Sequence, residues 1–228
     1  WNYLINHYES KGDFKQQLTL ANQAVKKFKG DYTLGFGYAK GLLNNGQYDA
    51  SINTLKKLYI LPFEGSSDGR DIYEQATLLS VLNLIRSKQY KNALTKIESS
   101  KEWPENLGVG KPYDVDERIQ DYLAAYCLDK LGKTGDARKS YDRVLAVTDE
   151  TFERVSINNI LPFLIYEKSG EKEKKAALLR KLKASPSSAH PLQRWVIAAA
   201  EKVQAALNDL SGELSGNAYI GIMIHILK

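Results

Sequence analysis

Polar breaks interrupt the sequence at regular intervals, and apolar residues recur at helical spacing between them. The five breaks are centred on Gly12, Gly46, Lys88, Gly132 and Gly170, so the successive intervals are 34, 42, 44 and 38 residues. This spacing predicts units of helix, turn and helix, each too small to bury its own apolar side and therefore stacked on the next. We expect an all-α fold of about five such pairs over residues 1–183, with capping helices over 184–228.

Alignment on the breaks reveals shared packing positions. The residue seven before each break is apolar in every unit: Ile5, Ala39, Val81, Ala125 and Phe163. The residue five after each break is small in units two to four, where it is Ser51, Ala93 and Ala137. In units one and five it is Gln17 and Lys175. Small residues at these positions let the two helices of a pair approach closely, which favours packing within each unit.

Two motifs show the repeat most clearly. They are GQYDASI at 46–52 and KQYKNAL at 88–94, each with an aromatic residue two positions after the break. The pattern resembles the tetratricopeptide repeat (TPR) family over roughly residues 1–183. The resemblance implies a right-handed α–α superhelix that serves as a protein-interaction scaffold and has no catalytic activity of its own.

Insertions at 61–70 and 103–112 lengthen the second and third intervals. Both contain aromatic residues and glycines, unlike a flexible linker, so they predict either ordered packing loops or a contact surface. The candidate contact residues are Phe63, Glu64, Arg70, Trp103, Lys111 and Tyr113.

The insertions also carry a narrower resemblance. ILPFEG at 60–65, GRDIY at 69–73 and WPENLGVGKPYD at 103–114 are similar to the C-terminal TPR region of large bacterial proteins. Those proteins begin with a β-sandwich similar to the galactose-mutarotase fold. The resemblance implies an alternative function, an accessory helical region of a carbohydrate-active enzyme whose catalytic part lies outside this chain.

The end of the chain is harder to interpret. Pro162 lies inside the first helix expected for the fifth pair, so that helix either starts late, with Asn159 as its cap, or kinks. We expect a loop at 185–188 and one long helix over 191–208. Residues 217–228 alternate like a strand, but a closing helix that caps the last repeat fits the helical context better.

Residues able to do chemistry are scattered. Cys127 lies in an apolar helical segment, and the three histidines belong to remote segments, so neither predicts a nucleophile or general base. The acidic residues at 114–121 lack the spacing of a calcium loop, and Asp114 or Asp116 is better explained as a helix cap. We expect no catalytic, cofactor-binding or metal site.

The net charge of +5 raises the question of nucleic acid. The excess is concentrated at 171–183, where no aromatic residue alternates with the lysines, so a solvated helix face explains it better than a nucleic-acid surface. No apolar run reaches the roughly 18 residues of a membrane span. The chain opens at Trp1 without an initiator Met, so we expect a piece of a longer protein, and the single cysteine favours a cytoplasmic location.

The first helices of the pairs are expected to line the inner wall of the array. Residues ten, six and three before each break should face that wall, giving it an apolar and aromatic centre. The candidates are Asn6, Phe36, Lys40, Leu78, Leu82, Tyr122, Tyr126 and Asp129. The wall would hold a protein or peptide segment, or be filled by the C-terminal helices or by a further N-terminal domain.

Overall fold

The structure, a computed structural model, describes residues 1–61, 68–214 and 216–227. These residues form thirteen α-helices and three short 3-10 helices and contain no strand, so the all-α prediction is confirmed. The chain divides into two compact units, Trp1–Val115 and Asp116–Lys228.

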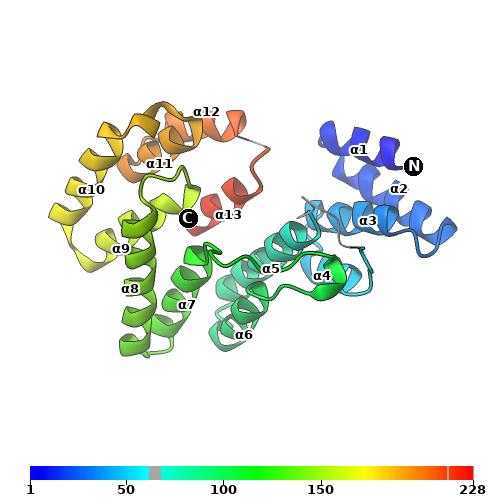
Figure 1. Cartoon of the computed structure of the whole chain (residues 1–228), viewed down its shortest axis with the longest axis horizontal. Coiled ribbons are helices and arrows are strands. Elements are labelled where there is room, and N and C mark those ends of the chain that lie inside the picture. Colours follow the sequence, from blue (N-terminus) through cyan, green and yellow to red (C-terminus); the bar gives the residue numbers. More distant parts are fainter. Residues whose placement is uncertain (62–67, 215, 228) are drawn as a thin grey trace. The chain divides into compact units, whose positions relative to one another are not determined.

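Unit 1 contains three helix pairs. They are α1 (Asn2–Ser10) with α2 (Phe14–Lys27), α3 (Tyr32–Asn44) with α4 (Tyr48–Leu55), and α5 (Asp68–Arg86) with α6 (Tyr90–Ser100). The 3-10 helix η1 (Glu105–Leu107) follows α6. Successive pairs pack in chain order, because α2 lies against α3 and α4 lies against α5 (Figure 1).

Unit 2 also contains three pairs, where two were predicted. They are α7 (Arg118–Lys130) with α8 (Thr134–Thr151), α9 (Leu161–Ser169) with α10 (Lys172–Ala184), and α11 (Pro191–Glu201) with α12 (Gln204–Glu213). The remaining elements are η2 (Ile157–Ile160), η3 (Pro186–Ala189) and α13 (Ala218–Leu227). Within this unit α8 packs on α9 and α10 packs on α11 (Figure 1).

All six pairs turn through the same backbone geometry. The left-handed residue of each turn has φ between 58° and 75°. Five of these residues are the predicted break centres Gly12, Gly46, Lys88, Gly132 and Gly170, and the sixth is Lys202. The residue after the left-handed one donates its N–H to the carbonyl five residues earlier at 2.8–3.0 Å in every turn. This bond satisfies a carbonyl that the end of the first helix leaves free, and it sends the chain back along that helix.

The single long helix predicted over 191–208 is wrong. Lys202 adopts φ 60° and ends α11, and the Val203 N–H donates to Ala198 at 2.9 Å. The region is therefore a sixth pair with the turn of the other five. Sequence reasoning missed it because apolar residues at helical spacing continue on both sides of Lys202, from Trp195 and Ala199 to Val203 and Ala206, so no polar break marks the turn.

The aligned packing positions are the buried seams of the pairs. The five residues that lie seven before each break are at most 1% exposed. Gln17, Ser51, Ala93 and Ala137, five after each break, are fully buried. The Ser51 hydroxyl donates to the Ala39 carbonyl at 2.7 Å, which shows how closely α4 approaches α3.

Pro162 resolves one of the alternatives. It lies in the first turn of α9, where its missing N–H breaks no helical hydrogen bond, so the helix starts late rather than kinking. Ile160, which immediately precedes α9, takes the cap position instead of Asn159. The closing helix expected near the C-terminus is confirmed as α13.

The second insertion is an ordered packing loop. Leu107 is 1% exposed and joins the core of unit 1 with Leu55 and Tyr73. The Asn106 amide donates to the carbonyls of Leu55 at 2.9 Å and Leu58 at 2.8 Å, so it caps the end of α4. Gly108 has φ 72°, and a Cβ there would lie 2.8 Å from the Ile60 carbonyl oxygen, so only glycine fits.

A buried arginine organises the start of unit 2. All five N–H groups of Arg118 have acceptors: Asp116 takes two, and Thr148, Ser156 and Asn159 take one each. Burial acts to raise the pKa of Asp116, but the hydrogen bonds and charge of Arg118 outweigh it and lower that pKa below its ordinary value. Asp116 also accepts from the Arg118 backbone N–H at 3.2 Å and so satisfies the first N–H of α7, although the N-cap position itself is held by Glu117.

Candidate functional site

Three predicted inner-wall residues share one side of α7 in unit 2. Tyr122, Tyr126 and Asp129 follow one another at spacings of four and three residues, which places their side chains above one another on a helix. The structure adds Tyr141 from α8 and Lys168 from α9 to this group. We call these five residues the tyrosine face.

A cation and a carboxylate join the three helices of the tyrosine face. The Lys168 ammonium donates to the Asp129 carboxylate and, at 2.7 Å, to the Tyr141 hydroxyl. The Tyr141 hydroxyl donates to the same Asp129 oxygen at 3.3 Å. Because both donors meet one acceptor, α9 is held to α7 and α8 at this point.

The rings of the tyrosine face form an aromatic surface. The Tyr122 and Tyr141 rings meet edge to face with their centroids 5.9 Å apart. Lys168 lies 4.7 Å from the Tyr141 centroid, and Lys130 lies 5.2 Å from the Tyr126 centroid. Cations at these distances are attracted to the ring faces, so the two lysines flank the aromatic surface rather than extending freely into solvent.

The phenols of the tyrosine face are unsuited to acid–base work. Burial raises the pKa of both Tyr122 and Tyr141, and the neighbouring Asp129 raises that of Tyr141 further. Both groups therefore stay neutral near pH 7, where a general base or nucleophile would need a lowered pKa. Half-buried tyrosines with polar tips are instead the side chains enriched in protein contacts.

Sequence reasoning missed Tyr141 and Lys168. Tyr141 lies nine residues after the break at Gly132, a position that suggests only packing between the helices of a pair. Lys168 precedes the next break by two residues and belongs to none of the aligned positions. The only sequence feature that could have indicated them is residue type: a tyrosine and a lysine, both able to donate a hydrogen bond to Asp129, lie on the two helices that follow it.

The predicted inner-wall residues of unit 1 do not form a comparable surface. Lys40 pairs with Glu9 at 2.6 Å, Asn6 is exposed, and Phe36 is half-buried against the core. Leu78 and Leu82 are 0% and 5% exposed, so their side chains are covered within the described structure. Helical spacing identifies an apolar side of a helix but does not say whether neighbouring segments cover it.

The loop candidates separate into buried and exposed residues. Arg70 is 2% exposed, stacks 4.6 Å above the Trp103 ring and donates to the Ser100 carbonyl at 2.8 Å. This pair fastens the second insertion to α5, so for Arg70 and Trp103 the structure favours the packing alternative over the contact surface. Tyr113 and Lys111 are exposed. Phe63 and Glu64 lie outside the described residues.

Residues able to bind metal or act as nucleophiles are spread along the part of the chain that the structure describes. The part of the chain that the structure describes holds no group of three or more histidine, cysteine or acidic residues placed to bind a metal ion. Burial raises the pKa of the Cys127 thiol to about 12, which keeps it protonated and unreactive. Across the same residues, no helix is both long and apolar enough to cross a membrane.

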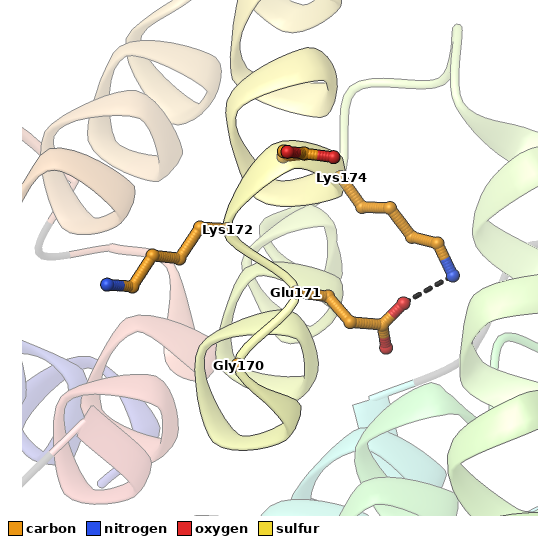
Figure 2. Close-up of a pocket in the computed structure, with 5 residues that line it drawn as sticks. Gly170, Glu171, Lys172 and Lys174 are labelled. Atoms are coloured by element: carbon orange, nitrogen blue, oxygen red, sulfur yellow. Dashed lines mark ion pairs between the residues drawn. The ribbon is translucent and has the colours of Figure 1, made fainter.

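A shallow depression lies at the start of α10 and is lined by residues 170–174 (Figure 2). The Glu171 carboxylate pairs with Lys174 and accepts from Ser169 at 2.8 Å, whereas the Lys172 side chain points away from that pair (Figure 2). The N-terminal end of a helix attracts anions, but here the N-cap residue Glu171 already places a negative charge at that end of α10, which disfavours a bound anion. The depression is the outside of one helical turn and shows no built ligand site.

Comparison of the chain with protein-family models, curated proteins and solved structures returned no match.

Proposed function

We propose that the chain is a non-catalytic protein-interaction module of the TPR kind, in which the stacked pairs belong to a right-handed α–α superhelix. The tyrosine face is proposed to hold a peptide segment of a partner protein. This extends the sequence-based expectation to five named side chains on three helices.

The arrangement of the tyrosine face supports the proposal. Tyr122, Tyr126 and Tyr141 are half-buried. Their side chains are already restricted in the free protein, so they lose less conformational entropy when a peptide binds. The contacts among Asp129, Tyr141 and Lys168 hold the surface in one geometry. A preorganised aromatic surface with hydroxyl, carboxylate and ammonium groups can bind apolar and polar parts of a peptide together.

Selection from a peptide library tests the proposal and does not require the partner to be identified. A displayed peptide library is panned on the whole chain, and the affinity of the enriched peptides is measured against wild type and Tyr126→Ala. We expect Tyr126→Ala to weaken binding about tenfold or more, as for an aromatic residue central to an interface.

Tyr113→Ala is the matched control, since it removes an equally large ring from an exposed loop. It should leave the affinity unchanged, and circular dichroism should show that both variants stay helical. Enriched peptides that bind Tyr126→Ala as tightly as wild type would place the binding surface elsewhere.

A further inference from the structure

The turn between α5 and α6 differs from the other five turns in charge. Each of the other five has a carboxylate within three residues of its left-handed residue, and the α5–α6 turn has none. Residues 75–97 contain four basic side chains and no acidic one. Arg86, Lys88 and Lys91 are exposed at this end of the pair, and we call them the basic turn.

Lys88 is one of two turn residues that adopt a left-handed backbone without being glycine. It adopts φ 58°, a left-handed backbone in which a side chain is strained and which glycine provides at four of the six turns. Lys202, the other exception, has a structural use for its side chain because it pairs with Glu167. Lys88 and Lys91 make no ion pair with any residue that the structure describes.

The charge at the end of α5 does not by itself account for a lysine at this position. Favourable charge at the C-terminal end of α5 is already supplied by Arg86 in the last helical turn. The remaining basic residue of the segment, Lys96, is used internally, since it pairs with Asp49 of α4 at 2.7 Å. The strained Lys88 therefore keeps an outward positive charge at a position where the fold itself favours glycine.

We propose that the basic turn is an interaction surface for an acidic segment of a partner protein. Carboxylates on such a segment would complement the charges of Lys88 and Lys91, with electrostatic attraction acting mainly on association. A nucleic acid fits less well, because three charges on one turn are fewer than the roughly 6–10 phosphate contacts typical of that binding. The surface is in unit 1 and is independent of the tyrosine face.

Titration of a fluorescein-labelled decaglutamate peptide against the whole chain at low salt tests the proposal. Lys88→Gly should weaken binding about three- to fivefold, the loss of one exposed ion pair. The same change should raise the Tm by about 2–4 °C, because it relieves the left-handed backbone. Lys88→Asn, which also tolerates this backbone, and Lys91→Gln should show the same loss of affinity.

Lys172→Gln is the matched control, since it removes one exposed charge from α10 in unit 2, and Tyr126→Ala separates this surface from the tyrosine face. Both should bind the peptide as wild type does. Equal weakening by Lys172→Gln would mean general attraction to a basic protein and would overturn the proposal. Unchanged affinity of the Lys88 variants, or tighter binding of a single-stranded oligonucleotide than of decaglutamate, would also overturn it.

Discussion

At the scale of single residues, backbone conformation decides where one helix of a pair ends. Four of the six turns use glycine for the left-handed position, and none of those four glycines has another atom within 4 Å of where a Cβ would be. Space is therefore available for a side chain, and only the backbone preference selects glycine. Replacing one of these glycines would therefore change stability through the backbone conformation alone, with no contribution from a steric clash.

Two neighbouring glycines test this explanation with opposite signs. Gly132 has φ 75° and Gly135 lies inside α8, and a Cβ at either would contact nothing. We expect Gly132→Ala to lower the free energy of unfolding by about 1–2 kcal/mol, the cost of a left-handed alanine. Gly135→Ala should raise it by about 0.5 kcal/mol, because alanine favours the helix. Urea denaturation measures both, and a loss of stability in both variants would contradict the conformational explanation.

The Asp116–Arg118 pair yields a second prediction at this scale. Asp116→Asn removes the carboxylate from an arginine that is 1% exposed in its side chain. We expect a loss of about 2 kcal/mol, less than the ~3–5 kcal/mol for a fully buried pair, because 37% of the Asp116 side chain remains exposed and screened by solvent.

The pH dependence of that loss follows from the lowered pKa of Asp116. A carboxyl with a lower pKa in the folded state stabilises the protein above its unfolded pKa of about 3.9, and this contribution disappears as pH falls through the folded value. Wild type and Asp116→Asn should therefore differ fully near pH 7 and converge below about pH 4. Asp136→Asn, an exposed partner of Lys139, should change stability by less than about 0.5 kcal/mol. A constant difference between wild type and Asp116→Asn at all pH values would rule out the ion pair as the cause.

At the scale of elements, the second insertion shows how a loop completes a helix. Asn106 supplies donors to two carbonyls at the end of α4, and the Ile60 N–H donates to the Asn106 carbonyl at 2.9 Å. These three bonds tie the segment after α4 to a loop that follows α6. The second insertion is therefore part of the core of unit 1 and not an appendage.

Asn106→Ala removes both side-chain bonds at once. We expect it to lower the free energy of unfolding by about 2 kcal/mol, since each bond contributes about 1 kcal/mol. Asn92→Ala is the control, because the Asn92 amide donates only to the neighbouring Gln89 side chain on the exposed face of α6. Thermal melting of the two variants distinguishes them, and equal melting temperatures would show that the loop does not stabilise α4.

Sequence patterns predicted elements better than they predicted surfaces. The break positions and the buried seams follow from residue type and spacing, and both agree with the structure at Ala39, Ala93 and Ala137. Spacing along one helix also grouped Tyr122 with Tyr126 and Asp129. It did not say whether Leu78 would be covered, however, and it omitted Lys168, because both depend on contacts between segments that periodicity does not specify.

At the scale of the whole molecule, the chain has two compact units joined near Val115. Tyr113 lies just before this boundary and is fully exposed. Tyr59, another exposed tyrosine in a connection, precedes Ile60, which is buried and hydrogen bonded through its N–H. A protease needs an accessible and extendable segment, so the connection at Tyr113 is the better substrate.

We expect limited chymotrypsin digestion to cut first after Tyr113, giving fragments 1–113 and 114–228 that mass spectrometry identifies. Each purified fragment should keep helical circular dichroism, because each unit has its own buried residues. Tyr113→Ala should slow the cut without changing the melting temperature. Initial cleavage elsewhere would show that the connection at Tyr113 is not the most accessible segment. Fragments that lose their helicity would show that the two units do not fold separately.

The lysine turns also bear on how helical hairpins are counted along a chain. A search for glycine at the left-handed position would find four of the six described hairpins and would miss α5–α6 and α11–α12, whose turns carry Lys88 and Lys202. Both of these turns have the hydrogen bond of the other four, since Gln89 and Val203 donate to the carbonyls five residues earlier. Backbone handedness therefore assigns hairpins that residue type leaves out.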